Sequence, residues 1–219
     1  MKVKFLSGII ALMILSLCAC NSQSTNQKAS EKPATPVPTA KATQKAVEEK
    51  APTENVVKAE LEMTDGSIIK IDLYPDVAPV TVENFIKLAK EGFYDNLIFH
   101  RVISGFMIQG GGFNEEMQQK KANTIKGEFK ANGVKNALKH TRGVLSMART
   151  SQSMDSASSQ FFIMHSEAPH LDGQYAAFGK VTEGLDIVDK IASVKTGNAN
   201  GMADVPETPQ VIKTIRIEE

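Results

Sequence analysis

The stretch from Phe99 to Gly111 limits the possible folds more than any other part of the chain. Its residues, FHRVISGFMIQGG, are mostly apolar and of strand-forming types, but an arginine, a glutamine and glycines are placed among them. A second apolar run, from Ser159 to Met164, follows later and also contains a glutamine. We interpret both runs as strands that carry polar residues at fixed positions.

Short strand-like runs and two helical patterns follow one another from residue 54 onward. The turn sequence TDGS predicts a hairpin, and Pro79 with an apolar face predicts a helix that Gly92 ends. The predicted strands cover 56–63, 68–74, 98–102, 106–109, 143–148, 160–165, 177–181 and 209–217, and the helices cover 79–90 and 185–192. Many strands with two helices predict a mainly β fold, a closed antiparallel β-barrel capped by the helices.

The N-terminus has the pattern of a secretory signal. Lys2 and Lys4 precede an apolar run over 5–17, which is shorter than the about 20 residues that a membrane span needs. An uncleaved anchor helix is disfavoured because polar sequence begins at Asn21. An ordinary signal peptide with incidental cysteines remains an alternative to the lipoprotein signal described next.

The apolar run ends in LCAC, which resembles a bacterial lipobox. We expect residues 1–19 to be removed as a signal peptide and Cys20 to carry the lipid. Cys18 is less suitable because Leu17 is too large directly before the cleaved bond. Multiple acyl chains hold a protein firmly to a membrane, because each buried methylene contributes about 0.8 kcal/mol.

Residues 20–53 contain too few apolar side chains to form a core. They are rich in Ser, Thr, Gln, Ala, Lys, Glu and Pro, and their prolines interrupt any helix. We interpret them as a disordered tether between the lipid and a folded domain over 54–219. The protein is therefore expected outside the cytoplasm, lipid-anchored to a bacterial membrane.

The charge and the reactive residues exclude several classes of protein. The chain has 25 basic and 25 acidic residues, so nothing favours binding to nucleic acid. Both cysteines lie in the N-terminal signal, which leaves the domain without a disulfide framework. The four histidines do not have the spacing of zinc motifs. We expect a monomer without metal or cofactor.

Six motifs occur in the same order as in the cyclophilins, which are peptidyl-prolyl cis/trans isomerases. The resemblance covers about residues 56–218, and it implies an eight-stranded antiparallel barrel with two capping helices. The motifs in this sequence are FHRVI from Phe99, GFMIQGG from Gly105, GVLSMA from Gly143, SQFFI from Ser159, LDG from Leu171 and FGKV from Phe178.

The chemistry of this family is rotation about the X–Pro peptide bond, which resonance opposes with a barrier of about 18–20 kcal/mol. A donor aimed at the proline nitrogen stabilises the twisted amide selectively, because the planar amide offers no lone pair there. The resemblance implies that Arg101 is this donor and that Gln109 and Phe106 share the catalytic site. A structural salt bridge is the alternative for Arg101, but an arginine within an apolar strand is costly to bury unpaired.

The resemblance also implies a substrate groove. Met107, Phe162 and Leu171 match the apolar pocket for the proline ring, although their periodicity alone would indicate ordinary core. The backbone of Ala148 and Arg149 matches the platform that pairs with the substrate strand, and Gln160 lines the groove. Many relatives have asparagine in place of Arg149, so this groove gains a charge.

Two positions depart from the best-known members of the family. His170 stands where they carry tryptophan, and Tyr175 stands where they carry a pocket histidine. Tyrosine is also aromatic with a polar tip, so the pocket can remain intact. The smaller His170 leads us to expect weak binding of cyclosporin.

The first functional hypothesis is an active prolyl isomerase that assists folding of exported, proline-containing polypeptides. The alternative is a module or holdase chaperone that binds proline segments in the same groove without turnover. Ser146 and His165 suggest a serine hydrolase, but the chain has no nucleophile-elbow motif, which excludes that class.

Overall fold

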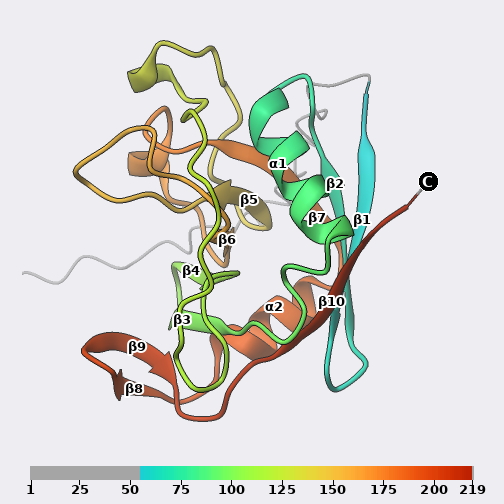
Figure 1. Cartoon of the computed structure of the whole chain (residues 1–219), viewed down its shortest axis with the longest axis vertical. Helices are drawn as coiled ribbons and strands as arrows, with labels where there is room; N and C mark the ends of the chain where they lie inside the picture. Colours follow the sequence, from blue (N-terminus) through green and yellow to red (C-terminus); the bar gives the residue numbers. More distant parts are fainter. Residues whose placement is uncertain (1–54, 219) are drawn as a thin grey trace, which may run out of the picture. The chain divides into compact units, whose positions relative to one another are not determined.

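The computed structural model describes residues 55–218 (Figure 1). The predicted signal peptide, Cys20, the tether and the domain start at residue 54 lie outside this range. Among the described residues, no helix has both the length and the apolar character required to cross a membrane.

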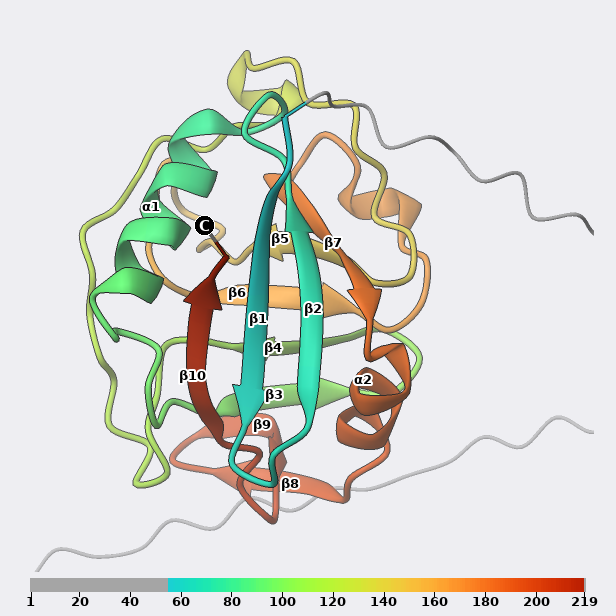
Figure 2. The same cartoon turned by 90° about the vertical axis from the view of Figure 1, so that its right-hand side faces the viewer.

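Eight strands form one antiparallel sheet, in the order β10-β1-β2-β7-β5-β6-β4-β3. Figure 2 shows that β10, β1 and β2 run across the direction of β6, β4 and β3, so the sheet is strongly curled. The strands are β1 (Val57–Met63), β2 (Ile68–Leu73), β3 (Phe99–Ile103), β4 (Met107–Gly110), β5 (Val144–Met147), β6 (Phe161–Met164), β7 (Ala177–Glu183) and β10 (Ile212–Ile217).

All eight predicted strands are therefore present in one sheet, but the predicted closure of the barrel is not confirmed. The edge strands β3 and β10 are not paired along their length. Only a short bridge, Ile98 to Val211, joins the segments that precede them. The result is a half-barrel whose concave face holds the main core.

The helices lie at opposite ends of the curled sheet (Figure 2). Helix α1 (Pro79–Lys90) begins with proline, as predicted, and buries Val82, Phe85 and Leu88. A residue distant in sequence caps its first turn: the buried Glu128 carboxylate accepts a hydrogen bond from the Thr81 N–H at 2.7 Å. Helix α2 (Leu185–Ala192) also has its predicted bounds.

The structure adds a second, two-stranded sheet that the sequence analysis did not predict. It is the hairpin of β8 (Thr196–Ala199) and β9 (Met202–Pro206), and β9 packs beside β3. Two short 3-10 helices, η1 (Lys130–Asn132) and η2 (Pro169–Leu171), were also not predicted. Segment 196–206 contains glycine and proline and few β-branched residues, so its local strand signal is weak.

Candidate active site

The candidate site is built on the convex face of β3, β4, β5 and β6. Successive side chains of a strand point to opposite faces of a sheet. In β4 and β6, Ile108 and Ile163 therefore enter the main core, whereas Met107 and Phe162 belong to a second apolar cluster. Pairing of β3 with β4 sets Arg101 opposite Gln109.

Two glycines explain the end of the Phe99–Gly111 stretch. A Cβ on Gly110 would lie 3.0 Å from the carbonyl oxygen of Ile98. A Cβ on Gly111, which has φ of 79°, would lie 2.9 Å from the carbonyl oxygen of Ser159. Only glycine fits this close approach of three segments, which brings β4 against the start of β6.

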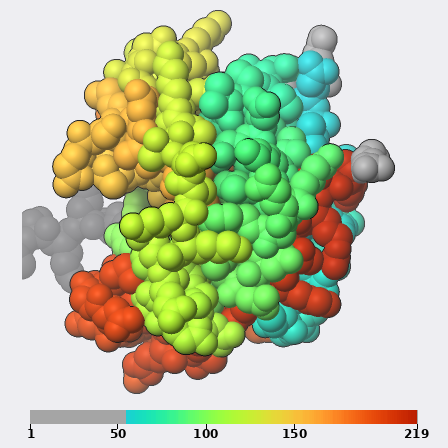
Figure 3. Space-filling view, in the orientation of Figure 1, coloured from blue at the N-terminus to red at the C-terminus, as the bar shows by residue number. Residues whose placement is uncertain are grey.

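A groove of about 370 Å³ collects nearly all the predicted site residues. Figure 3 shows the β8–β9 hairpin, coloured red, below the orange loops on the same side of the domain. Of the predicted residues, only Gln160 is absent from the lining, and it lies directly behind Gln109. The groove is lined by Arg101, Phe106, Met107, Gln109, Ala148, Arg149, Phe162, His170, Leu171 and Tyr175.

The apolar wall of the groove is pre-formed. Met107, Phe162 and Leu171 are buried in the second cluster, separate from the main core. Phe162 meets the Tyr175 ring edge to face, with centroids 5.9 Å apart, and Phe106 stacks on His170 at the same separation. These buried side chains also line the groove, as a pocket for an apolar ring requires.

The polar wall consists of Arg101 and the Gln109 amide. Gln109 Nε2 donates to Gln160 Oε1 at 3.0 Å and lies 3.5 Å from His100 Nε2. Arg101 is half-exposed at the rim, and its Nε lies 3.7 Å from Asp204 Oδ2. The amide of Gln109 is thus oriented by Gln160 and not by Arg101.

Arg149 forms the opposite edge of the groove in a fixed position. Its Nε donates to the Gln174 carbonyl and its Nη1 to the Thr150 carbonyl, both at 3.0 Å. The guanidinium lies over the Tyr175 ring, 4.7 Å from the centroid, and over Phe129 at 5.2 Å. No carboxylate is paired with it within residues 55–218, so it adds an uncompensated charge to the groove.

A match to a family of known proteins agrees with this geometry. The model for the cyclophilin-type peptidyl-prolyl cis-trans isomerases matches residues 58–217, most of the chain. The chain belongs to the cyclophilin family.

Relatives in several organisms support the assignment. Peptidyl-prolyl cis-trans isomerase A of Dickeya dadantii is 46% identical over 70% of this chain and 81% of its own length. Isomerase B of Escherichia coli is 44% identical over 71% of this chain and 97% of its own length. The cyclophilin of Cryptosporidium parvum, solved in the presence of the dipeptide Ala-Pro, has a TM-score of 0.64 at 30% identity over 74% of this chain and 99% of its own. This protein is accordingly a peptidyl-prolyl cis-trans isomerase.

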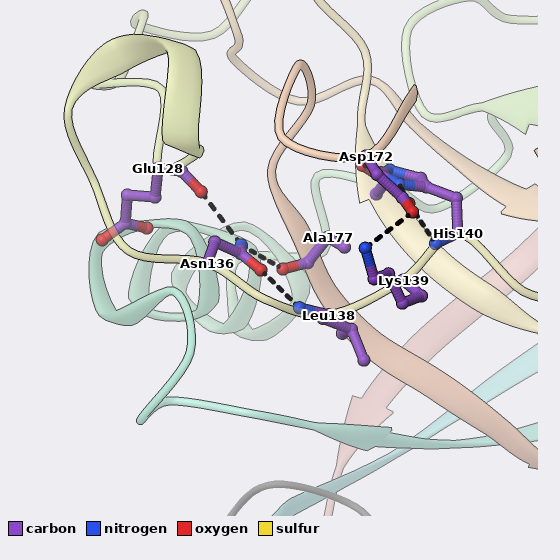
Figure 4. A network of polar contacts seen from close by, with 8 residues as sticks. Glu128, Asn136, Leu138, Lys139, His140, Asp172 and Ala177 are labelled. Atoms are coloured by element: carbon purple, nitrogen blue, oxygen red, sulfur yellow. Dashed lines mark hydrogen bonds and ion pairs between the residues drawn. The ribbon is translucent and has the colours of Figure 1, made fainter. Parts of the chain in front are cut away.

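The pocket of this cyclophilin is supported from behind by buried polar groups (Figure 4). Asp172, which follows Leu171, accepts from the His140 backbone N–H at 2.8 Å and lies 3.0 Å from its Nδ1. The His140 ring stacks on Phe162, with centroids 6.1 Å apart. Burial lowers the pKa of His140, so the ring stays neutral at pH 7. Sequence reasoning missed this support, because His140 lies in an irregular segment without a periodic pattern.

His140 also lies 3.0 Å from Ser146 Oγ, which completes a Ser–His–Asp arrangement with Asp172. The sequence analysis considered His165 as the partner of Ser146, but His165 Nδ1 instead accepts from the Gly105 N–H. Ser146 is fully buried at 0% exposure, so no substrate carbonyl can reach its oxygen. The cyclophilin fold uses these three residues as structure, and the hydrolase interpretation stays excluded.

No metal centre supplements the groove in the described part of the chain, where no cluster of three or more histidine, cysteine or acidic side chains is found. Burial lowers the pKa of His100 to about 4, so this residue is neutral beside Arg101. Arg101 is then the cation at the Gln109 side of the groove.

Proposed function

We propose that this cyclophilin accelerates rotation about X–Pro bonds of exported polypeptides while it is lipid-anchored outside the cytoplasmic membrane. The observation that carries the catalytic part is the position of Arg101, which lines the same groove as the apolar side chains proposed to hold the proline ring. A prolyl isomerase needs this combination, since a ring must be held while a donor faces its nitrogen.

In the proposed mechanism Met107, Phe162 and Leu171 hold the proline ring, and the Arg101 guanidinium donates to the proline nitrogen as the amide twists. Gln109 binds the carbonyl of the preceding residue. The exposed N–H groups of Arg101 stabilise the twisted amide more than the planar amide. They therefore lower the barrier to rotation and do not merely strengthen substrate binding. Each 1.36 kcal/mol of such differential stabilisation gives about tenfold in rate.

The Cryptosporidium parvum cyclophilin supports this choice of substrate, because it was solved in the presence of the dipeptide Ala-Pro. Here, the backbone at Ala148 and Arg149 would pair with the residues that flank the proline. The lipid on Cys20 and the tether over 20–53 would place the groove beside newly exported chains. Support for this location comes from the sequence pattern of residues 1–20 alone.

The test is a protease-coupled isomerisation assay with a proline peptide. Arg101→Ala should lose most of the activity, and Arg101→Lys should also be poor because an ammonium does not reproduce the planar guanidinium fork. Arg216→Ala is the matched control, since Arg216 is an exposed arginine on β10 that pairs with Glu62. A folded Arg101→Ala protein with wild-type turnover would refute the mechanism.

The same variants separate the isomerase from the non-catalytic binding module. If the groove only binds proline segments, wild-type protein should bind the peptide and show no isomerisation above background. If the proposal is correct, Arg101→Ala should keep most of its peptide affinity, because the apolar wall is unchanged. Binding is measured by titration of an unlabelled peptide against a fluorescent one.

A further inference from the structure

The β8–β9 hairpin places a carboxylate beside Arg101. Asp204 Oδ2 lies 3.7 Å from Arg101 Nε, and the two side chains are 40% and 41% exposed. The two residues are far apart in sequence, and β9 packs along β3 to bring them together. Arg101 on β3 is therefore half-exposed and has an acidic partner from the hairpin.

The backbone at Asp204 departs from regular strand geometry. Val205 pairs with Gly197 and Met202 pairs with Ala199, so Ala203 and Asp204 together face Asn198 as a β-bulge. Asp204 has φ of 62°, in the left-handed region that non-glycine residues seldom occupy inside a strand. Bulges re-aim side chains, and strained backbone is often found at functional sites.

The atoms in contact also matter. Asp204 meets Arg101 at Nε, on the side of the guanidinium nearest the chain. The four N–H bonds of Nη1 and Nη2 therefore remain for other acceptors. A carboxylate that competed with substrate would be expected to take the two terminal nitrogens in the bidentate geometry common for arginine.

We propose that Asp204 is a positioning residue for the isomerase: it restricts the rotamers of Arg101 so that the guanidinium faces the groove before substrate arrives. This inference rests on the proposed role of Arg101 as the donor. Arginine has high rotamer entropy, and limiting that freedom in the free protein lowers the cost of ordering it in the transition state. The hairpin is thereby a functional part of the site.

The test uses two substitutions in the full chain, held in detergent. Asp204→Asn removes the charge with almost no change of shape, and asparagine tolerates positive φ. Asp204→Gly also removes the carboxylate, and glycine adopts this positive φ without strain. Each should lower kcat about fivefold, the scale of an exposed ion pair, with little change in KM. Glu207→Gln is the matched control, because Glu207 pairs with Lys195 at the base of the hairpin, directly outside β8 and β9.

A double-mutant cycle separates this inference from the proposed function. In an Arg101→Ala background, Asp204→Asn should have no further effect on kcat. An unchanged or raised kcat in Asp204→Asn and Asp204→Gly would overturn the positioning role, as would an equal loss in the Arg101→Ala background. Wild-type turnover by Arg101→Ala alone would instead overturn the donor role on which the inference rests.

Discussion

Acidification should destabilise the folded domain through His100, well above the range in which carboxylates titrate. The ring is 3% exposed, and burial lowers its pKa from 6.5 to about 4. Between these values the unfolded chain binds a proton that the folded chain does not bind. The free energy of unfolding is therefore unaffected by this group above about pH 6.5, falls as the pH is lowered, and reaches its minimum contribution near pH 4.

The size of the effect follows from the separation of the two pKa values. A difference of 6.5 − 4 corresponds to about 3 kcal/mol in full, and about 2 kcal/mol of this is lost by pH 5. Small domains have only about 5–15 kcal/mol of stability, so the loss is readily measured. In the folded protein His100 is protonated only near its own pKa of about 4, which would stop its Nε2 from accepting from the Gln109 amide, so turnover should fall near pH 4.

The measurement is urea unfolding of residues 54–219 at pH 7 and pH 5, followed by circular dichroism. His100→Gln should lose about 2 kcal/mol less than wild type across this interval. The free energy of unfolding of His100→Gln should still fall somewhat between pH 7 and pH 5, because burial also lowers the pKa of His140. An equal loss of unfolding free energy between pH 7 and pH 5 in wild type and His100→Gln would refute the reasoning.

Three further outcomes are expected. Glu128→Ala should lower the free energy of unfolding by about 3 kcal/mol, because the Thr81 N–H and hydroxyl lose their buried acceptor; a loss under about 1 kcal/mol in urea unfolding would contradict this. His170→Trp should strengthen cyclosporin inhibition at least about tenfold with far less effect on proline turnover, and unchanged inhibition would show that position 170 is unimportant for the drug. Cys20→Ser should abolish labelling by a fatty-acid analogue, and label that persists would place the lipid elsewhere.

Short-range sequence patterns predicted the helices and strands whose ends and faces are determined by neighbouring residues. Proline at the start of α1 and Gly92 just beyond its end define that helix without reference to the rest of the chain. The alternation of β1 and β2 likewise indicates strands with one buried face, and their burial alternates accordingly. The prediction that Arg101 shares a groove with the pocket side chains came from the order of the family motifs. Periodicity alone could not distinguish the wall of a groove from the core.

Long-range contacts account for what was missed. The β8–β9 hairpin is held by packing beside β3, and its Gly, Asn and Pro residues give little strand signal of their own. No local pattern relates Asp204 to Arg101, or Ser146 to His140, because these pairs form only when the sheet curls. Closure of the barrel depends in the same way on two edge strands that are distant in sequence.

The division of side chains between the two faces of β4 and β6 has a consequence for divergence within the family. Ile108 and Ile163 hold the domain together from one face, while Met107 and Phe162 shape the groove from the other. A substitution in the groove alters a small cluster and leaves the larger one intact. Groove substitutions that preserve the volume of the second cluster can therefore change substrate preference without disturbing the main core.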